Sequence, residues 1–375
     1  MDLPNYFKDF LAEIRPTSDQ RTKMKKKHRE LRDHLETDDE LRPLIISTFI
    51  QGSYRRFTAT RAENGDKCDV DVIAVTNMHE SDFSARNALE KFRPFLEKHY
   101  SGQYRLQGRS WGIEVDDEVT LDLVPTSAPS EAEQQAMEWT RAAAWDFPEE
   151  RGSLLLNEDD RYFFESFLNA SATPQWKEEP LRIPDREADE WDDTHPLEQI
   201  RWTWQKNRDT NSHYVNVVKA IKWWRKVQQP WPKYPKSYPL EHMIGNCCPD
   251  GISSVGAGVT AAFEAMEMTY RPLVLAGLTP VLGDRGVPHH NVLNRVAPDD
   301  FASFLNNVSD AADLARRALD AESVKESADL WRELFGTRFP APPAEEGDAA
   351  SQSGAATGGF TPRVNSGRIG EGRFA

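Results

Sequence analysis

The pattern of apolar and polar positions divides the chain into a first half that contains strands and a second half that is helical. Three short apolar stretches, at residues 44–50, 69–76 and 119–124, are bounded by polar, turn-forming residues and predict β-strands. A fourth short strand is expected near residues 104–108. Helical spacing of apolar residues predicts one helix near residues 81–98.

A long helix is expected before the first of these strands. Thr17 and the two residues after it form a capping sequence, and Met24, Leu31 and Leu35 repeat at helical spacing to about Glu36. The alternation of strands and helices that follows indicates a mixed α/β region with a compact sheet.

Beyond residue 197 the periodicity is helical almost to residue 339. Residues 173–196 are rich in Pro, Asp, Glu and Trp and predict a surface loop or linker. From residue 340 the composition changes to Pro, Gly, Ala and Ser, which predicts a flexible tail. The fold class is therefore α+β, with a small mixed sheet packed on a mostly α-helical C-terminal half. The predicted segments are a core at 1–172, a linker at 173–196, a helical domain at 197–339 and a tail at 340–375.

Charge and composition narrow the classes of function. The 375 residues include 46 Lys and Arg against 61 Asp and Glu, and this formal charge of −15 argues against stable binding to a DNA or RNA duplex. Three cysteines do not make a disulfide framework. The N-terminus lacks the pattern of a secretory signal, and no apolar run has the roughly 18 residues of a membrane span. A cytoplasmic protein without a membrane segment is expected.

The most informative chemistry lies between residues 52 and 71. Asp69 and Asp71 are two apart on a predicted strand, so their carboxylates leave from one face. Two converging carboxylates repel each other unless a cation lies between them, and Mg²⁺ prefers such oxygen ligands. Gly52 and Ser53 follow the preceding strand, where a small residue and free amide groups favour phosphate binding.

Asp122 is the predicted third carboxylate, because it interrupts an apolar strand in which an unpaired buried acid would be costly. An outward-facing Asp on an edge strand is the alternative. Together, Asp69, Asp71 and Asp122 would hold two magnesium (or manganese) ions, which would activate a ribose hydroxyl and neutralise a triphosphate. The sequence thus predicts a nucleotidyltransferase with Asp69, Asp71 and Asp122 as catalytic metal ligands.

Five motifs together resemble the CD-NTases, the bacterial cGAS/DncV-like nucleotidyltransferases of CBASS anti-phage defence. They are GSYRRFTATR (52–61), CDVDVIAVT (68–76), EVTLDLVPT (118–126), VNVVKAIKWWRK (215–226) and PKSYPLEHMIG (235–245). The resemblance extends from the N-terminal helix to about Phe339 and is strongest to clade D. It implies a polymerase-β-like core with an N-terminal spine helix, and synthesis of a cyclic di- or trinucleotide messenger from ATP and GTP. The product would act on a downstream effector.

The resemblance also assigns roles to residues of the helical half. Lys219 corresponds to a helix lysine that reaches the triphosphate, with a solvated lysine on an amphipathic helix as the alternative. Ser237 and Tyr238 correspond to a pair that contacts the triphosphate and stacks on the donor base, although a tyrosine beside two prolines also suits a packing role.

A zinc site like that of animal cGAS is not expected. His242, Cys247 and Cys248 reproduce part of such a spacing but follow Tyr238, and no later cysteine supplies a fourth ligand. Only a distant histidine such as His289 or His290 would complete it. Buried helix cysteines are the favoured interpretation, and activation by DNA is not predicted.

The C-terminus suggests a protein partner. In type II CBASS systems, a bacterial E2/E1-like ligase conjugates the C-terminus of the CD-NTase to targets, and a flexible arm that ends in Ala375 suits such chemistry. Simple terminal disorder is the alternative.

Two other functions stay open from the sequence. One is a synthase of linear oligonucleotides or an enzyme that adds nucleotides to an RNA end. The other is a catalytically silent nucleotide-binding scaffold, against which the three retained aspartates argue.

Overall fold

The computed structural model describes residues 1–130, 180–228 and 233–342. By its internal contacts the chain divides into residues Met1–Ala341 and Pro342–Ala375, and only the first unit is described below. Residues 131–172 of the predicted core, 173–179 of the predicted linker and 343–375 of the predicted tail therefore lie outside the described residues. Within those residues, no helix is both apolar enough and long enough to span a bilayer.

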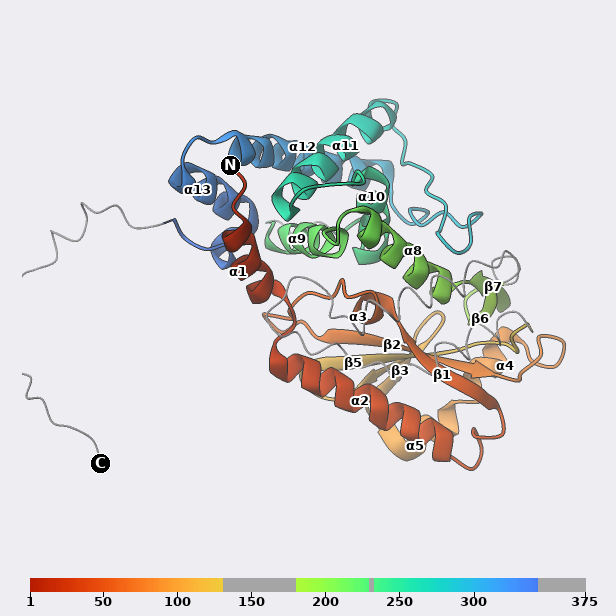
Figure 1. Ribbon diagram of the computed structural model, residues 1–375. Helices are drawn as coiled ribbons and strands as arrows, with labels where there is room; N and C mark the ends of the chain where they lie inside the picture. Colours follow the sequence, from red (N-terminus) through yellow and green to blue (C-terminus); the bar gives the residue numbers. More distant parts are fainter. Residues whose placement is uncertain (131–179, 229–232, 343–375) are drawn as a thin grey trace, which may run out of the picture. The chain divides into compact units, whose positions relative to one another are not determined.

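A five-stranded mixed sheet forms the centre of the N-terminal half (Figure 1). Its order is β1-β2-β5-β4-β3, and only β2 and β5 are parallel among these neighbours. The two strands that carry the aspartates, β2 and β5, therefore run in the same direction. The strands are β1 (Ile45–Gln51), β2 (Cys68–Thr76), β3 (Tyr104–Leu106), β4 (Trp111–Glu114) and β5 (Val119–Pro125).

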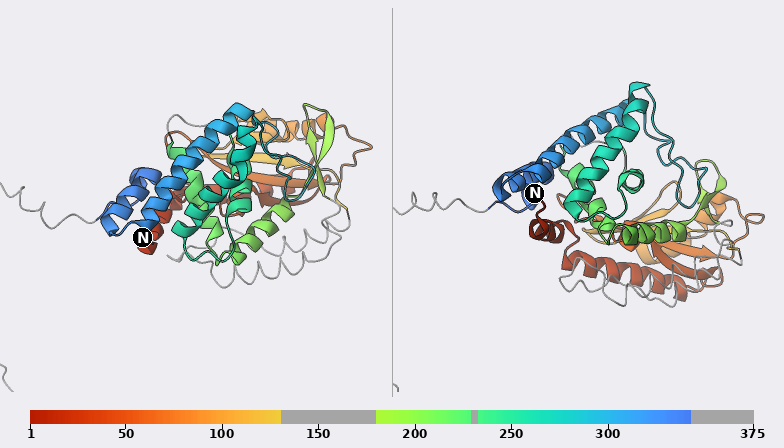
Figure 2. Two further views of the ribbon diagram at one scale, coloured as in Figure 1. Left: turned by 90° about the horizontal axis from the view of Figure 1, so that it is seen from above. Right: turned by 45° about the horizontal axis from the view of Figure 1, so that its top comes forward.

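One face of the sheet packs on helix α2 (Ser18–Thr37), which lies along it in Figures 1 and 2. The predicted start of this helix is confirmed, because the Thr17 hydroxyl accepts a hydrogen bond from the Gln20 amide in a capping box. Its predicted apolar contacts are fully buried. Val70 and Val72 of β2 belong to the same hydrophobic cluster.

The opposite face of β2 belongs to a second hydrophobic cluster, which contains Ile73 and Val75 together with the helices of the C-terminal half. Strand alternation therefore places Asp69 and Asp71 on the side of the sheet that faces these helices. The helices are α8 (Pro196–Asp209), α9 (Tyr214–Val227), α10 (Ser237–Cys247), α11 (Val255–Leu275), α12 (Pro298–Asp320) and α13 (Val324–Phe335), followed by the 3₁₀ turn η2 (Gly336–Arg338).

Helix α1 (Pro4–Ile14) packs on the C-terminal helices although it begins the chain. The Phe7 ring meets Trp331 edge-on at 5.0 Å, and Phe10 stacks on Phe335 at 4.6 Å. These buried aromatic contacts connect the two ends of the unit in space.

Two expectations for the N-terminal half were wrong in detail. The single helix expected at residues 81–98 is two helices, α4 (Ala85–Glu90) and α5 (Arg93–Tyr100). Pro94 lies in the first turn of α5, where a proline is tolerated, but it prevents a continuous helix. Strand β4 was not predicted because it is only four residues long and contains a glycine.

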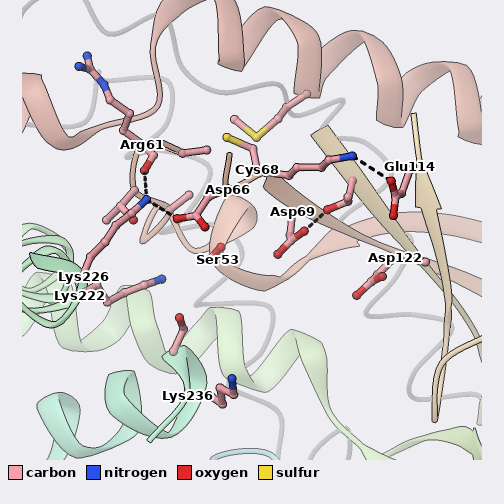
Figure 3. Close-up of a pocket in the computed structure, with 18 of the residues that line it drawn as sticks. Ser53, Arg61, Asp66, Cys68, Asp69, Glu114, Asp122, Lys222, Lys226 and Lys236 are labelled. Atoms are coloured by element: carbon pink, nitrogen blue, oxygen red, sulfur yellow. Dashed lines mark hydrogen bonds and ion pairs between the residues drawn. The ribbon is translucent and has the colours of Figure 1, made fainter. Parts of the chain in front are cut away.

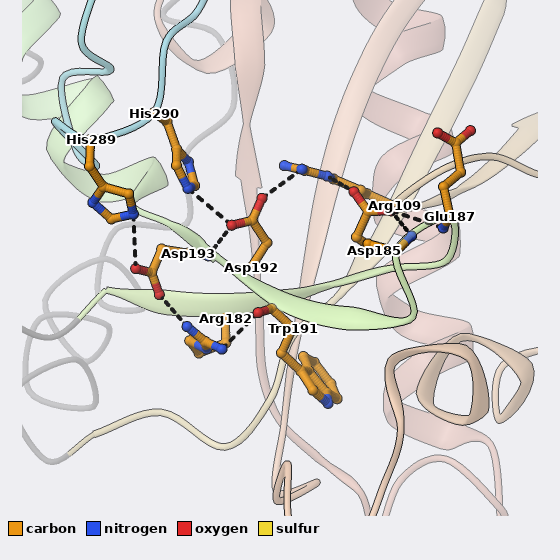
Figure 4. Close-up of polar contacts among 10 residues, drawn as sticks. Arg109, Arg182, Asp185, Glu187, Trp191, Asp192, Asp193, His289 and His290 are labelled. Carbon is orange, nitrogen blue, oxygen red and sulfur yellow. Dashed lines mark hydrogen bonds and ion pairs between the residues drawn. The ribbon is translucent and has the colours of Figure 1, made fainter.

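The expectation of a loop at residues 173–196 was wrong for the described part of this segment, which forms a β-hairpin. Strands β6 (Leu181–Asp185) and β7 (Glu190–Thr194) pair antiparallel around a turn in which Asp189 has φ 52°. Leu181 and Ile183 alternate toward the core. The acidic residues that suggested a loop instead make polar contacts, with Asp192 and Asp193 facing His290 and His289 (Figure 4).

Candidate active site

A tight turn after β1 lies against the acidic pair of β2. The short helix α3 (Gly52–Arg55) begins there, and Gly52 has φ 76°. A Cβ atom on Gly52 would lie 1.8 Å from Asp71 Oδ2, so both the backbone angle and the space require glycine. The Thr58 and Ala59 amides donate hydrogen bonds to the Ser53 carbonyl, at 2.9 and 3.2 Å. The turn therefore lies directly against Asp71 at Gly52 and is hydrogen-bonded to the following residues at Ser53.

The three aspartates lie on two adjacent strands. Asp71 and Asp122 are directly opposite each other in the parallel ladder of β2 and β5, and Asp69 is two residues before Asp71 on the same face. Asp71 and Asp122 are half-buried, whereas Asp69 is exposed. The sheet therefore brings together the three carboxylates that the sequence singled out.

Crowding and burial change the acidity of two of these groups. Burial raises the pKa of Asp71 to about 6, with a further contribution from Asp69, while the charge of Arg56 opposes the change. Burial, followed by the charges of Asp71 and Asp69, raises the pKa of Asp122 to about 7. A site that destabilises its own negative charges in this way favours a cation.

Two of the three carboxylates accept hydrogen bonds from neighbouring side chains in this structure. The Gln107 side-chain amide donates to Asp122 Oδ1 at 2.9 Å, and the Thr120 hydroxyl donates to Asp69 Oδ1. Among the described residues, no three His, Cys, Asp or Glu side chains are arranged to ligate one metal ion. The donor set matches the oxygen ligands that magnesium prefers, and both hydrogen bonds engage Oδ1, so Oδ2 of Asp69 and of Asp122 would take part in binding an ion.

A cavity of about 700 Å³ opens beside the aspartates. Figure 3 shows Ser53, Asp69 and Asp122 on its sheet side and Lys222 and Lys236 on its helical side. The cavity is large enough for a nucleotide, since small-molecule sites are typically about 300–1,000 Å³. Cationic side chains supply much of its lining: Arg61, Lys67, Arg105, Lys222, Arg225, Lys226 and Lys236.

The lysines of α9 that line the cavity differ from the one that the sequence singled out. Lys219 is buried, with 6% of its surface exposed, and it is not among the lining residues. Lys222 and Lys226, one and two turns further along α9, do line it. Their spacing from Lys219 by three and seven residues places all three on one helix face, a signal already present in the sequence.

The predicted pair at the start of α10 is divided between two environments. Ser237 is exposed and lines the cavity. The Tyr238 side chain is not part of that lining. Its hydroxyl donates to Asp284 Oδ2 at 2.5 Å, and the Arg56 guanidinium lies 5.4 Å from its ring centroid. The position of Tyr238 thus matches the packing alternative more closely than base stacking.

The remaining candidates among the described residues do not line the cavity. Cys247 and Cys248 are buried free thiols, and burial raises their pKa values to about 11 and about 12. His289 and His290 instead contact the acidic hairpin. Ala375 lies outside the described residues.

Comparisons with known proteins identify the family to which the chain belongs. The family model for a Second Messenger Oligonucleotide or Dinucleotide Synthetase domain matches residues 1–147. A cyclic AMP-AMP-GMP synthase of Enterobacter hormaechei subsp. hoffmannii is 41% identical over 374 residues, and a probable cyclic AMP-AMP-GMP nucleotide synthase of Salmonella paratyphi B is 39% identical over 382 residues. Each alignment covers 96% of both chains.

The fold is also similar to that of solved relatives. The structure of CdnC with ATP from E. coli MS115-1 superposes with a TM-score of 0.60 at 16% identity, covering 90% of this chain and 99% of the other. Fold and sequence therefore lead to one assignment. With relatives of about 40% identity along nearly its whole length, the chain belongs to the CD-NTase family of second-messenger oligonucleotide synthetases.

Proposed function

We propose that this CD-NTase joins ATP and GTP into cyclic AMP-AMP-GMP and releases pyrophosphate at each bond. The observation that carries the proposal is the pairing of Asp71 with Asp122 beside the Gly52 turn, next to a nucleotide-sized cavity that Asp69 and Asp122 line. The choice of product rests on the names of the two relatives that are about 40% identical. Membership of clade D stays a prediction.

The cationic side of the cavity suits a triphosphate. Lys222 and Lys226 project from α9, and Lys236 precedes α10, opposite the aspartates (Figure 3). Ser53 offers a hydroxyl group at the turn, which is the usual position for a phosphate contact after a strand. These groups would hold the triphosphate with its α-phosphorus toward the carboxylates.

The aspartates would perform the metal-dependent part of the reaction. Asp69, Asp71 and Asp122 would hold magnesium, or manganese in its place, which in a two-ion arrangement supplies charge neutralisation and an acidified ribose hydroxyl. Gln107 would orient Asp122 for this role. Gly52 would keep the turn close enough to Asp71 for phosphate and carboxylate to share one site.

Product analysis tests the proposal directly. The purified chain is incubated with four nucleoside triphosphates and Mg²⁺, and products are identified by mass spectrometry before and after nuclease P1 and phosphatase treatment. The expected product lacks a 5′-triphosphate and contains two AMP units and one GMP unit. Linear products that retain the triphosphate would favour the linear synthase. Nucleotide binding without any product would favour the silent scaffold.

We also propose that the C-terminus is a conjugation site for an E2/E1-like ligase. The support is the resemblance to the family in which such conjugation is expected. Removal of residues 373–375 is expected to abolish a covalent adduct with the ligase while synthesis in vitro continues. Adduct formation by the truncated chain would contradict this proposal.

A further inference from the structure

The residues after the phosphate turn adopt an unusual backbone path. Phe57 has φ 57°, a left-handed conformation that costs a non-glycine residue roughly 1 kcal/mol or more. Its ring is buried and meets Trp204 edge-on at 5.3 Å, inside the helical cluster. The residues on either side of it, Arg56 and Thr58, are also buried, and both reach one acceptor.

That acceptor is the carboxylate of Glu241 on α10, a residue that is 6% exposed. Its Oε2 accepts from Arg56 Nε at 3.2 Å, and its Oε1 accepts from the Thr58 hydroxyl at 3.0 Å. The same Oε1 accepts from Lys222 Nζ at 3.0 Å. Lys222 also donates to the Thr58 carbonyl at 3.0 Å.

Glu241 remains charged in this environment. Burial alone would raise the pKa of its carboxyl, but Lys222 and Arg56 outweigh burial and hold the pKa below its usual value. A buried ion pair is weak evidence for added stability, but the hydrogen bonds of this one join three groups to a single carboxylate. The contacts of Glu241 therefore restrict both the residues after the turn and a lysine of the opposite wall.

The backbone extends this restriction to the turn itself. The Arg56 amide donates to the Gly52 carbonyl at 3.1 Å, and the Thr58 amide donates to the Ser53 carbonyl at 2.9 Å. On the helical side, the Tyr214 hydroxyl donates to the Glu241 backbone carbonyl at 3.2 Å and fixes the helix that carries it. A continuous set of short contacts thus joins the Gly52 turn to Lys222 through one carboxylate.

We propose that Glu241 is a positioning residue that sets the phosphate-binding turn and Lys222 at the separation that a bound triphosphate requires. This inference rests on the proposed function for its catalytic consequence, and on the described contacts for its structural one. Glu241 does not line the cavity, so it acts through Lys222 and the turn.

The kinetic test is a double-mutant cycle. Glu241→Gln is expected to lower kcat about tenfold with wild-type Lys222, because small misplacements in an active site are costly, and to change KM for ATP by less than about threefold. In a Lys222→Met background, the same substitution is expected to lower kcat by less than about twofold, since the group that it positions is gone. If the fold-changes in kcat of Glu241→Gln and Lys222→Met simply multiply in the double variant, the inference would be overturned. Thr58→Val, which removes one donor to the same carboxylate, is expected to show a smaller effect with the same dependence on Lys222.

A second readout separates this inference from the proposed function. Hydrogen exchange of the amides of Thr58 and Ala59 reports how firmly the turn is held, and it does not need turnover. Glu241→Gln is expected to accelerate their exchange at least about tenfold, whereas Glu198→Gln, an equally buried acid paired with Arg201, is expected to leave it unchanged. Unchanged exchange in both variants would overturn the inference even if the wild-type chain makes cyclic product. If Glu241→Gln accelerates exchange but the wild-type chain makes no cyclic product, only the proposed function would be overturned.

Discussion

Asp71 and Asp122 face each other directly across the one parallel strand pair of the five-stranded sheet. Directly opposite residues of paired strands project to the same side, so the chain places two half-buried carboxylates next to each other. Such an arrangement opposes folding unless it is compensated, and Arg56 and Gln107 provide part of that compensation. Neighbouring carboxylates whose pKa values are raised by burial and by each other are typical of a functional site.

Gly52→Ala is predicted to abolish synthesis and to destabilise the fold. The new Cβ would overlap the Asp71 carboxylate at 1.8 Å and would stand at φ 76°. Activity is expected to fall at least about 100-fold, since both the turn and Asp71 must move. Gly65→Ala is the matched control, because Gly65 has φ 88° but nothing within 4 Å of its Cβ position. That variant is expected to lose only about 1 kcal/mol of unfolding free energy and to keep its activity. Equal activity losses in both variants would contradict the account.

Gln107 variants are predicted to act through Asp122. The Gln107 amide lies 2.3 Å from the Cβ position of Gly112, and the Ser110 hydroxyl donates to its oxygen at 3.3 Å. Gln107→Ala is expected to lower kcat about tenfold and to raise the Mg²⁺ concentration for half-maximal activity. Gln107→Glu is expected to lower kcat further, because a carboxylate cannot donate this hydrogen bond and repels Asp122. The exposed Gln103→Ala should behave as wild type, and a Gln107→Ala enzyme with unchanged magnesium dependence would rule out this role.

His28 is predicted to make stability depend on pH. The ring is 1% exposed, neither ring nitrogen has a hydrogen-bond partner among the described residues, and the ring meets Tyr54 edge-on at 5.6 Å. Burial, followed by the charges of Arg32 and Arg29, lowers its pKa from 6.5 to about 3. The unfolded chain therefore binds the proton more readily, so this contribution to stability is complete above about pH 6.5 and is lost progressively as the pH falls toward 3.

The measurement is the free energy of unfolding by urea at pH 7.5 and pH 5. The loss between the two values is expected to be smaller by about 2 kcal/mol in His28→Phe than in wild type. His79→Gln, a change at an exposed histidine, is the control and is expected to follow wild type. A pH dependence that His28→Phe leaves unaltered would show that other groups account for it.

Sequence reasoning located the acidic part of the site because that part is local. Asp69 and Asp71 are neighbours on one strand, and Asp122 interrupts an apolar run, so each deviates from a short-range pattern. Their meeting then required only that β2 and β5 be adjacent in the sheet. The cap at Thr17 was predictable for the same reason.

The parts that were not predicted depend on long-range contacts. Glu241 has no local signature, and its contacts with Arg56 and Thr58 span more than 180 positions in the chain. The choice of Lys222 over Lys219 depends on where along α9 the cavity lies, which periodicity alone does not fix. The β6–β7 hairpin was not predicted because its acidic side chains pair with arginines: Asp185 and Asp192 with Arg109, which is distant in the sequence, and Asp193 with Arg182 of β6 itself.

The most direct test of the central claim is synthesis by the Asp69→Ala/Asp71→Ala double variant, compared with Asp117→Ala, a change at an exposed aspartate of the turn before β5. Each protein is supplied with ATP, GTP and Mg²⁺, and cyclic product is quantified by mass spectrometry alongside a thermal unfolding curve. The account predicts a folded double variant with no detectable product and a control with wild-type output. Cyclic product from the folded double variant at the wild-type rate would contradict it.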